Sequence, residues 1–227
     1  MLFKQFFEEK SSTYTYLLAC ETTKQAVLID PVACEVEKYQ QALKGYTLLY
    51  TLDTHVHADH ITAANLLREH CGSKSVLNRY SDVECGDILV TDGCVLRIGK
   101  FEIETLYTPG HTNSCTSYLV GNMVFTGDAL LIDGCGRTDF QHGSAEMLYD
   151  SIHNKLFCLP DETIVYPGHD YNGRTASTIL KERTTNSRLG AGRSKADFIE
   201  LMNNLDLPYP KQIDIALPAN QVCGKQK

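Results

Sequence analysis

The chain has 227 residues, of which 43% are hydrophobic and 22% charged, and its formal net charge is −7. This length and apolar content suffice for a full hydrophobic core, and we expect a single domain over residues 1–227. The acidic balance argues against nucleic acid as a routine partner, because phosphate binding needs a basic surface. No apolar run approaches the roughly 18 residues of a membrane span, and the amino-terminal stretch is too acidic for a targeting peptide, so we expect a cytoplasmic protein.

The predicted elements alternate between strands and helices. In chain order they are a hairpin (13–19 and 26–30), a helix (36–43), a strand (47–52), a helix (61–70), a strand (101–107), a hairpin (116–120 and 123–126), a helix (145–156), a strand (163–166) and two helices (176–184 and 195–203). Ser144 is the expected N-cap of the helix that follows it. Strand-rich halves interleaved with helices indicate an α/β sandwich with helices outside two packed sheets.

The cysteines do not follow a disulfide pattern. Nine are present, which is an odd number, and no pair has C-x-x-C spacing. We therefore expect neither a disulfide framework nor a structural zinc ribbon. Most of the cysteines are interpreted as small apolar residues buried in the core of a protein from a reducing compartment.

The stretch from Thr54 to His60, T-H-V-H-A-D-H, follows a predicted strand and holds three histidines and one carboxylate. Side chains alternate along an extended segment, so His55 and His57 are expected to project to the same side. Asp59 and His60 follow where the chain turns toward the next helix. A solvated polar loop is the alternative. Four such groups at one spot would be costly to bury without a cation, so we interpret the stretch as part of a metal site.

Three more residues of metal-ligand type stand just after predicted strands, each beside a glycine that permits a tight turn. They are His111 in T-P-G-H-T, Asp128 in F-T-G-D and His169 in Y-P-G-H-D. A lone histidine after a strand is more often an ordinary surface or core residue, but these positions and the first motif together favour metal binding. The remaining histidines lack this context and are interpreted as structural: His70, His142 and His153.

The order of these residues resembles the metallo-β-lactamase superfold, whose signature is H-x-H-x-D-H followed by a histidine, an aspartate and a last histidine. The resemblance covers nearly the whole chain and implies an αβ/βα sandwich of two packed mixed sheets with helices outside. In that superfold one metal would take His55, His57 and His111, and a second would take Asp59, His60 and His169, with Asp128 able to bridge them. Because every position is filled, a module that only binds a ligand is not expected.

Several stretches further resemble the persulfide dioxygenase branch, also called sulfur dioxygenase. They are residues 57–62 (H-A-D-H-I-T), 134–141 (G-C-G-R-T-D-F-Q), 167–171 (P-G-H-D-Y), 202–205 (M-N-N-L) and 217–220 (L-P-A-N). That family oxidises glutathione persulfide with O2, giving sulfite and glutathione, at one Fe(II) bound by two histidines and one aspartate. By motif position, the resemblance implies one Fe(II) per chain on His55, His111 and Asp128, which would form the catalytic centre.

This ligand set suits the chemistry that the resemblance implies. Two imidazoles and one carboxylate on one face of the metal leave open positions, as in non-haem iron oxygenases. A persulfide sulfur and O2 could then bind side by side, so no protein nucleophile is needed. The residues left over would orient the ligands, hold water or belong to a second metal: His57, Asp59, His60 and His169.

Five residues are candidates for binding the substrate. Arg137 could pair with a carboxylate of glutathione, because a guanidinium fork matches a carboxylate, and the alternative is an arginine that organises its loop. Arg188 and Tyr171 are weaker candidates for the same role. Thr112 could offer its hydroxyl to a ligand or be a turn residue. Cys135 could line the pocket or pack in the core.

The closest alternative is a glyoxalase II-type thioester hydrolase, which uses the same ligands, two metals and a bridging hydroxide. Because the chain given after His169 is short, we do not expect the longer helical glutathione-binding domain of that family. An exported lactamase and a nuclease with a basic groove fit the sequence less well. The expected partners are therefore glutathione persulfide and O2, without nucleic acid or membrane, and the resemblance suggests a homodimer.

Overall fold

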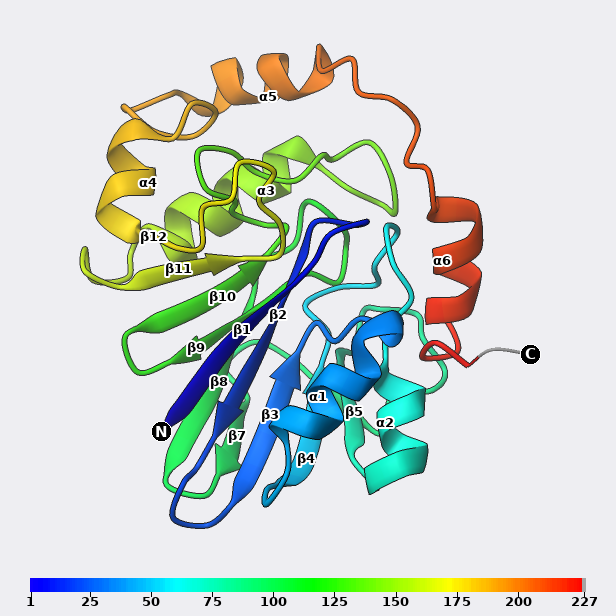
Figure 1. Ribbon diagram of the computed structural model, residues 1–227. Coiled ribbons are helices and arrows are strands. Elements are labelled where there is room, and N and C mark those ends of the chain that lie inside the picture. Colours follow the sequence, from blue (N-terminus) through cyan, green and yellow to red (C-terminus); the bar gives the residue numbers. More distant parts are fainter. Residues whose placement is uncertain (226–227) are drawn as a thin grey trace. The chain divides into compact units, whose positions relative to one another are not determined.

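The computed structural model describes residues 1–225 (Figure 1). These residues form two compact units. Unit 1 contains Met1–Val90, Val95–Ile103 and the chain from Tyr209 onward, and unit 2 contains Thr91–Cys94 and Glu104–Pro208. The single domain expected over residues 1–227 stays a prediction.

Unit 1 is built on a mixed sheet in the order β1-β2-β3-β4-β5-β6. The strands are β1 (Leu2–Glu8), β2 (Thr13–Ala19), β3 (Gln25–Ile29), β4 (Thr47–Leu52), β5 (Lys74–Asn78) and β6 (Ile88–Val90). From β1 to β3 the pairing is antiparallel, and from β3 to β6 it is parallel. Because Ile29 pairs with Leu52, the residues that follow β3 and β4 emerge at the same sheet edge.

Helices of unit 1 connect the parallel strands. A 3-10 turn (Ala33–Glu35) leads into α1 (Val36–Ala42) between β3 and β4, and α2 (Ala64–Cys71) lies between β4 and β5. The prediction that a helix begins at residue 61 was wrong over the first turn, because α2 begins at Ala64. Residues 61–63 instead pair with the segment after β3, where the Ala33 amide donates to the Ile61 carbonyl at 2.8 Å. The helix ends at Gly72, whose φ of 70° is a left-handed conformation that glycine adopts without strain.

The carboxyl-terminal part of unit 1 contains α6 (Ile213–Asn220) and a disulfide between Cys85 and Cys223. Neither was predicted, because the sequence argument against a disulfide framework gave no reason to expect a single bond. The two cysteines are separated by 138 positions, so the spacing of neighbouring cysteines could not predict the bond. The expectation of buried cysteines holds for some of the others, whereas Cys34, Cys71 and Cys158 are exposed.

The second sheet has the order β12-β11-β10-β9-β8-β7, and most of it belongs to unit 2. Its strands are β7 (Val95–Ile98), β8 (Phe101–Tyr107), β9 (Thr116–Val120), β10 (Met123–Gly127), β11 (Ile164–Pro167) and β12 (Ser177–Thr178). The predicted hairpin of β9 and β10 turns at Gly121, which has a φ of 58°. Strands β10 and β11 are parallel and Gly127 pairs with Pro167, so the residues after both strands emerge together.

Helices of unit 2 begin at hydroxyl side chains that accept main-chain hydrogen bonds. Ser144 caps α3 (Ala145–Ser151), which continues into a π-helical turn (Ile152–Leu156), Thr178 caps α4 (Ile179–Thr185), and Ser194 caps α5 (Lys195–Asn203). The helix predicted from residue 176 starts later, because residues 177–178 form β12. The core of this unit gathers apolar residues from the sheet and helices, among them Val124, Leu148, Ile152, Val165 and Phe198.

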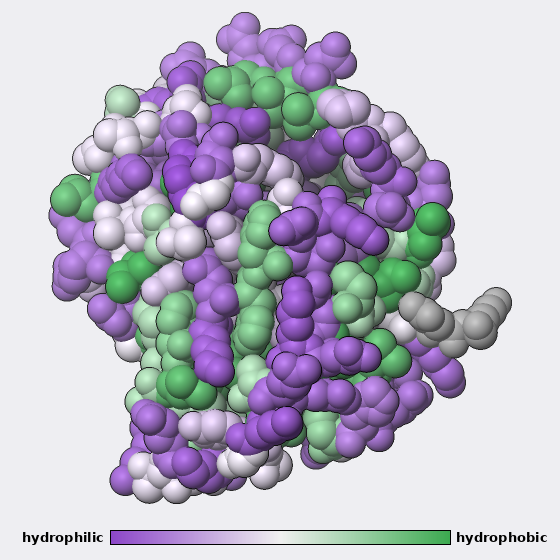
Figure 2. Space-filling model, in the orientation of Figure 1, coloured by the Kyte–Doolittle hydropathy of each residue, from purple (hydrophilic) through white to green (hydrophobic). Residues whose placement is uncertain are grey.

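Hydrophilic residues cover most of the face shown in Figure 2, and hydrophobic residues lie there in separate strips. Large apolar side chains with high exposure include Tyr171 and Ile215. Among the helices in the described part of the chain, none combines the length and the apolar character needed to span a bilayer.

Candidate metal centre

The histidine motif forms a buried loop in unit 1, directly after β4. His55 and His57 are only 3% and 2% exposed, and His60 is 6% exposed. The ring of His57 lies 4.2 Å from the ring of His55 and 4.2 Å from that of His60, measured between centroids. The loop therefore brings three imidazoles together, and the rings of His55 and His57 are adjacent as side-chain alternation predicts.

A buried carboxylate that the sequence reasoning missed, Asp30, holds this loop. It follows β3 with a φ of 50° and is 1% exposed. It accepts hydrogen bonds from the amide and hydroxyl of Thr54 at 2.7 and 2.9 Å, and from Nε2 of His57 at 3.0 Å. A neutral His57 that donates from Nε2 keeps its lone pair on Nδ1, so Asp30 selects the nitrogen available to a metal.

A second carboxylate, Asp53, lies beside the first and was also missed. It accepts a hydrogen bond from the Thr62 hydroxyl at 3.0 Å. Burial and the charge of Asp30 raise the pKa of Asp53 to about 7, and burial also raises the pKa of Asp30. Both acids stand immediately after parallel strands, as Asp128 does, but neither has the neighbouring glycine that marked Asp128 in the sequence.

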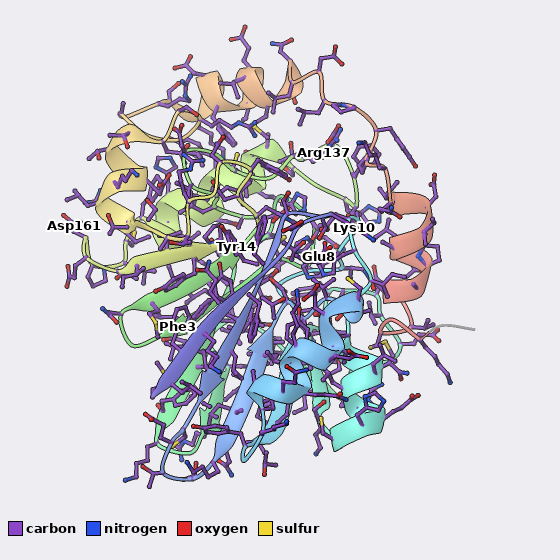
Figure 3. All side chains as sticks on the ribbon, in the orientation of Figure 1. Phe3, Glu8, Lys10, Tyr14, Arg137 and Asp161 are labelled. Carbon is purple, nitrogen blue, oxygen red and sulfur yellow. A yellow bond between two sulfur atoms is a disulfide. The ribbon has the colours of Figure 1, made fainter. Side chains whose placement is uncertain are left out.

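Asp59 and His60 contact the turn of the β1–β2 hairpin. Oδ2 of Asp59 accepts a hydrogen bond from the Thr13 hydroxyl at 3.0 Å and faces Nδ1 of His60 at 2.9 Å. The turn is ordered by Glu8, whose carboxylate accepts from the Ser11 hydroxyl at 2.6 Å, and Figure 3 labels Glu8 at this end of the hairpin. Ligand atoms of the motif residues His57, Asp59 and His60 lie within 4.8 Å of one another.

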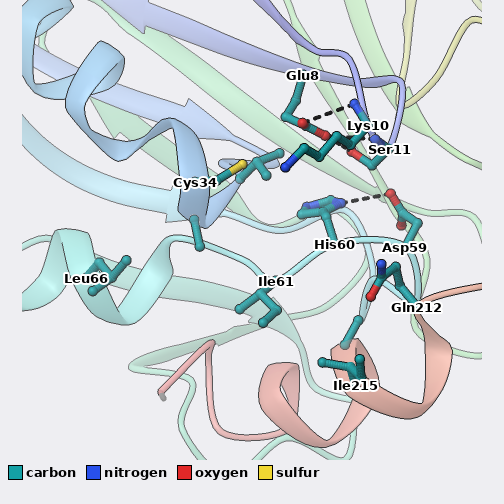
Figure 4. Close-up of a pocket in the computed structure, with 13 residues that line it drawn as sticks. Glu8, Lys10, Ser11, Cys34, Asp59, His60, Ile61, Leu66, Gln212 and Ile215 are labelled. Carbon is teal, nitrogen blue, oxygen red and sulfur yellow. Dashed lines mark hydrogen bonds and ion pairs between the residues drawn. The ribbon is translucent and has the colours of Figure 1, made fainter.

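A cavity of about 310 Å³ opens beside Asp59 and His60 (Figure 4). Its walls come from the hairpin turn, from the segment after β3 and from α6, all within unit 1. The polar lining includes Lys10 and Gln212, and the apolar lining includes Ile61 and Ile215. The motif thus borders a space large enough for a small molecule.

In unit 2, His111 follows β8 on a turn that requires glycine. Gly110 has a φ of 136°, and a Cβ there would lie 2.3 Å from the main chain of Leu148. Nδ1 of His111 donates to the carbonyl of Arg137 at 2.7 Å. Since a carbonyl only accepts, this hydrogen bond fixes the tautomer of the neutral ring and leaves Nε2 as the coordinating nitrogen.

Asp128 lies between two histidines of unit 2. Its Oδ2 is 3.6 Å from Nε2 of His111, and its Oδ1 is 3.5 Å from Nε2 of His169. A divalent ion with ligands at about 2.1 Å holds neighbouring ligand atoms roughly 3–3.5 Å apart, so these donors fit a metal. Gly168 permits the arrangement, because a Cβ there would lie 2.6 Å from Oδ1 of Asp128.

The predicted substrate residues all belong to unit 2. The guanidinium of Arg137 makes two 2.6 Å hydrogen bonds to the carboxylate of Asp139, which supports the loop-organising alternative. Arg188 donates to the carbonyl of Cys135 at 2.8 Å. Tyr171 is 74% exposed and its ring stacks on that of His169 at 6.1 Å.

Two of the predicted substrate residues are buried. Cys135 is 3% exposed in the core of unit 2, and burial raises the pKa of its thiol to about 11. Thr112 is 2% exposed, and its hydroxyl contacts Ser114 and Cys115 inside the turn. Their environments are those of packing and turn residues.

The comparisons with known proteins identify relatives over the whole chain. A model described as the metallo-beta-lactamase superfamily matches residues 10–169, which include every ligand-type position above. Persulfide dioxygenase ETHE1, mitochondrial, of Mus musculus is 49% identical over an alignment covering 100% of this chain and 90% of that protein. The Homo sapiens protein of that name is 48% identical with the same coverage. This chain is a member of the persulfide dioxygenase family.

The fold agrees with this membership. The crystal structure of ETHE1 from Myxococcus xanthus has a TM-score of 0.97 and 52% identity, covering 99% of this chain and 100% of that one. The mixed sheets with their helices are therefore the metallo-β-lactamase fold that the motifs predict. A probable hydroxyacylglutathione hydrolase of Schizosaccharomyces pombe is more distant, with 35% identity over 74% of this chain and 69% of that protein.

Proposed function

We propose that this persulfide dioxygenase family member oxidises glutathione persulfide with O2 and water to sulfite and glutathione. The identity of 49% to a persulfide dioxygenase over the full chain is the observation that carries the proposal. The thioester-hydrolase alternative shares the ligand types, but its relative is less similar and is matched over a smaller part of the chain.

We propose one Fe(II) per chain with His55, His111 and Asp128 as its ligands. Two neutral imidazoles and one carboxylate are the donor set of mononuclear oxygenases. When bound, the iron supplies open coordination positions at which sulfur and oxygen can react. The hydrogen bond from His111 to the Arg137 carbonyl directs Nε2 toward such an ion, and the burial of His55 keeps that side chain in place.

The other motif residues serve the centre without being iron ligands in this proposal. Asp30 orients His57 through Nε2, and the Thr13 hydroxyl orients Asp59. These groups, with His60 and His169, hold water and accept the protons that sulfite formation releases. For the thiol carrier, Tyr171, Arg188 and Arg137 stay candidates, whereas we assign Cys135 and Thr112 to packing.

Anaerobic iron reconstitution followed by an oxygen-electrode assay tests this function. We expect about one iron per chain and O2 uptake with glutathione persulfide, and no cleavage of S-lactoylglutathione in a parallel assay. His55→Ala should lose both iron and O2 uptake. His70→Ala is the matched control, because His70 is an exposed histidine that contacts Gln40 on α1. Two metals per chain with thioester cleavage and no O2 uptake would refute the proposal.

The location and assembly of the protein stay predictions. The mammalian relatives carry the word mitochondrial in their names, whereas for this chain we propose a cytoplasmic location, which cell fractionation would test. We also propose a homodimer, which light scattering of the purified protein would test.

A further inference from the structure

The loop that carries the histidine motif lacks regular secondary structure, so its main-chain polar groups need partners from elsewhere. Residues 57–62 belong to no helix or strand in the described chain. The Ile61 carbonyl is paired with the segment after β3, and three further partners come from the far end of the sequence, at the last residue of α6. Asn220 is 5% exposed, and its side-chain amide contacts this loop in unit 1.

The amide of Asn220 makes three hydrogen bonds to the loop. Nδ2 donates to the carbonyls of His57 and His60, both at 2.8 Å, and Oδ1 accepts from the amide of Thr62 at 2.9 Å. The two carbonyls can only accept and the Thr62 amide can only donate, so the orientation of the Asn220 amide is unambiguous. Both N–H groups and the oxygen are used, and aspartate in the same place would lose both donors.

These contacts lie on both sides of the residues that surround the proposed metal site. The two carbonyls flank Ala58 and Asp59, so fixing them fixes the main chain that carries Asp59 and His60. Close packing of the following segment adds to the restraint, because the Asn65 amide donates to the Cys223 carbonyl at 3.0 Å. A Cβ at Gly224 would lie 2.1 Å from the Thr62 carbonyl oxygen, so only glycine admits this approach.

The same helix also borders the cavity next to the motif. In Figure 4, Ile215 of α6 and Gln212, the N-cap residue that precedes this helix, line the cavity together with Asp59 and His60. The helix therefore contacts the motif in two ways, as a wall of the space beside it and as the anchor of its main chain. The L-P-A-N stretch at residues 217–220 thus has a physical role that its sequence alone does not reveal.

We propose that Asn220 is a positioning residue for the metal centre: its three main-chain hydrogen bonds set where His57, Asp59 and His60 present their side chains. The inference deepens the proposed function and relies on it only for the identity of the metal. In the proposed function His57, Asp59 and His60 surround the iron without ligating it, and disturbing such outer groups of a metal site typically weakens metal binding 10- to 100-fold. We expect Asn220→Ala to raise the dissociation constant for Fe(II) about tenfold or more.

Three measurements on the full chain separate positioning from a purely structural role. The first is hydrogen–deuterium exchange of residues 57–62 in the metal-free protein, which should quicken in Asn220→Ala. The second is the Fe(II) dissociation constant. The third is the electron paramagnetic resonance spectrum of the ferrous–nitric oxide adduct, whose line positions should shift. Asn220→Asp, which keeps the size and the acceptor, should behave like Asn220→Ala if the two donated bonds matter.

Ile213→Ala and Gln221→Ala are the controls. Ile213 is a buried residue of α6 and Gln221 is an exposed neighbour of Asn220, and neither side chain lines the cavity. Ile213→Ala should lower the melting temperature while keeping the iron affinity and the spectrum. The proposal is overturned if both Asn220 variants keep iron affinity within twofold, the parent spectrum and parent exchange. A parent protein that binds iron without O2 uptake would refute the proposed function alone.

Discussion

Removal of the Asp30 carboxylate should both destabilise the protein and weaken its metal binding. In Asp30→Ala, the amide and hydroxyl of Thr54 and Nε2 of His57 lose their acceptor inside unit 1. Hydrogen bonds to a charged group contribute about 1.5–3 kcal/mol each, or roughly 5–9 kcal/mol for three. Removing the buried carboxylate recovers a desolvation cost of several kcal/mol. We expect a net loss of about 2–4 kcal/mol.

Urea unfolding of the metal-free protein measures this loss, and iron titration should show at least tenfold weaker binding. Glu102→Ala is the control, because the Glu102 side chain is 57% exposed and pairs only at the surface with Arg97. Removing the Asp30 charge should also lower the pKa of Asp53 from about 7, which carbon-13 NMR can follow. If Asp30→Ala were as stable as Glu102→Ala, with unchanged iron affinity, the loop would not depend on this carboxylate.

Two further predictions concern pH and a glycine. Burial acts to raise the pKa of Asp87, but a main-chain amide and Arg68 together hold it below its ordinary value. The contribution of Asp87 to the free energy of unfolding is therefore fully present above the pKa of the unfolded chain, about 3.9. It is lost as the pH falls through the lower pKa of the folded protein. Asp87→Asn should lower the free energy of unfolding by about 1 kcal/mol at pH 7, a value reduced because the side chain is partly exposed, and by almost nothing near pH 2. A difference in unfolding free energy that stays constant over this pH range would contradict the prediction. Gly168→Ala should weaken iron binding about tenfold, because the new methyl group would clash with the carboxylate of Asp128. Gly134→Ala is the control and should bind iron normally, because the space at its Cβ is open. Equal iron affinities of the two variants would show that the clash does not matter.

The positions of three residues of metal-ligand type could be predicted because a local sequence signal marks them. A strand followed by glycine and a polar residue marks His111, Asp128 and His169, and the structure places each just after β8, β10 and β11. Local periodicity also predicts most strands and the Ser144 cap. It fails at residues 61–63, because their helical spacing competes with pairing to a segment some thirty positions away.

Contacts between distant parts of the chain could not be predicted. Asn220 reaches His57 across 163 positions, and the disulfide joins cysteines 138 positions apart, so neither leaves a local spacing. Asp30 and Asp53 carry the strand-end signal, but only the register that pairs Ile29 with Leu52 makes them neighbours. The pairing of Arg137 with Asp139 could have been predicted, because Asp139 lies only two residues further along the chain and competes with a substrate carboxylate for the guanidinium.

The parallel register of β10 and β11 has a consequence for engineering unit 2. Asp128 and His169 gain their proximity from paired backbones, although the segment between them contains α3 and a long crossover. Insertions into that crossover would lengthen the chain between the two residues without changing the paired strands β10 and β11, after which they stand. Grafted loops could therefore alter the surroundings of the two side chains while their mutual spacing is inherited from the sheet.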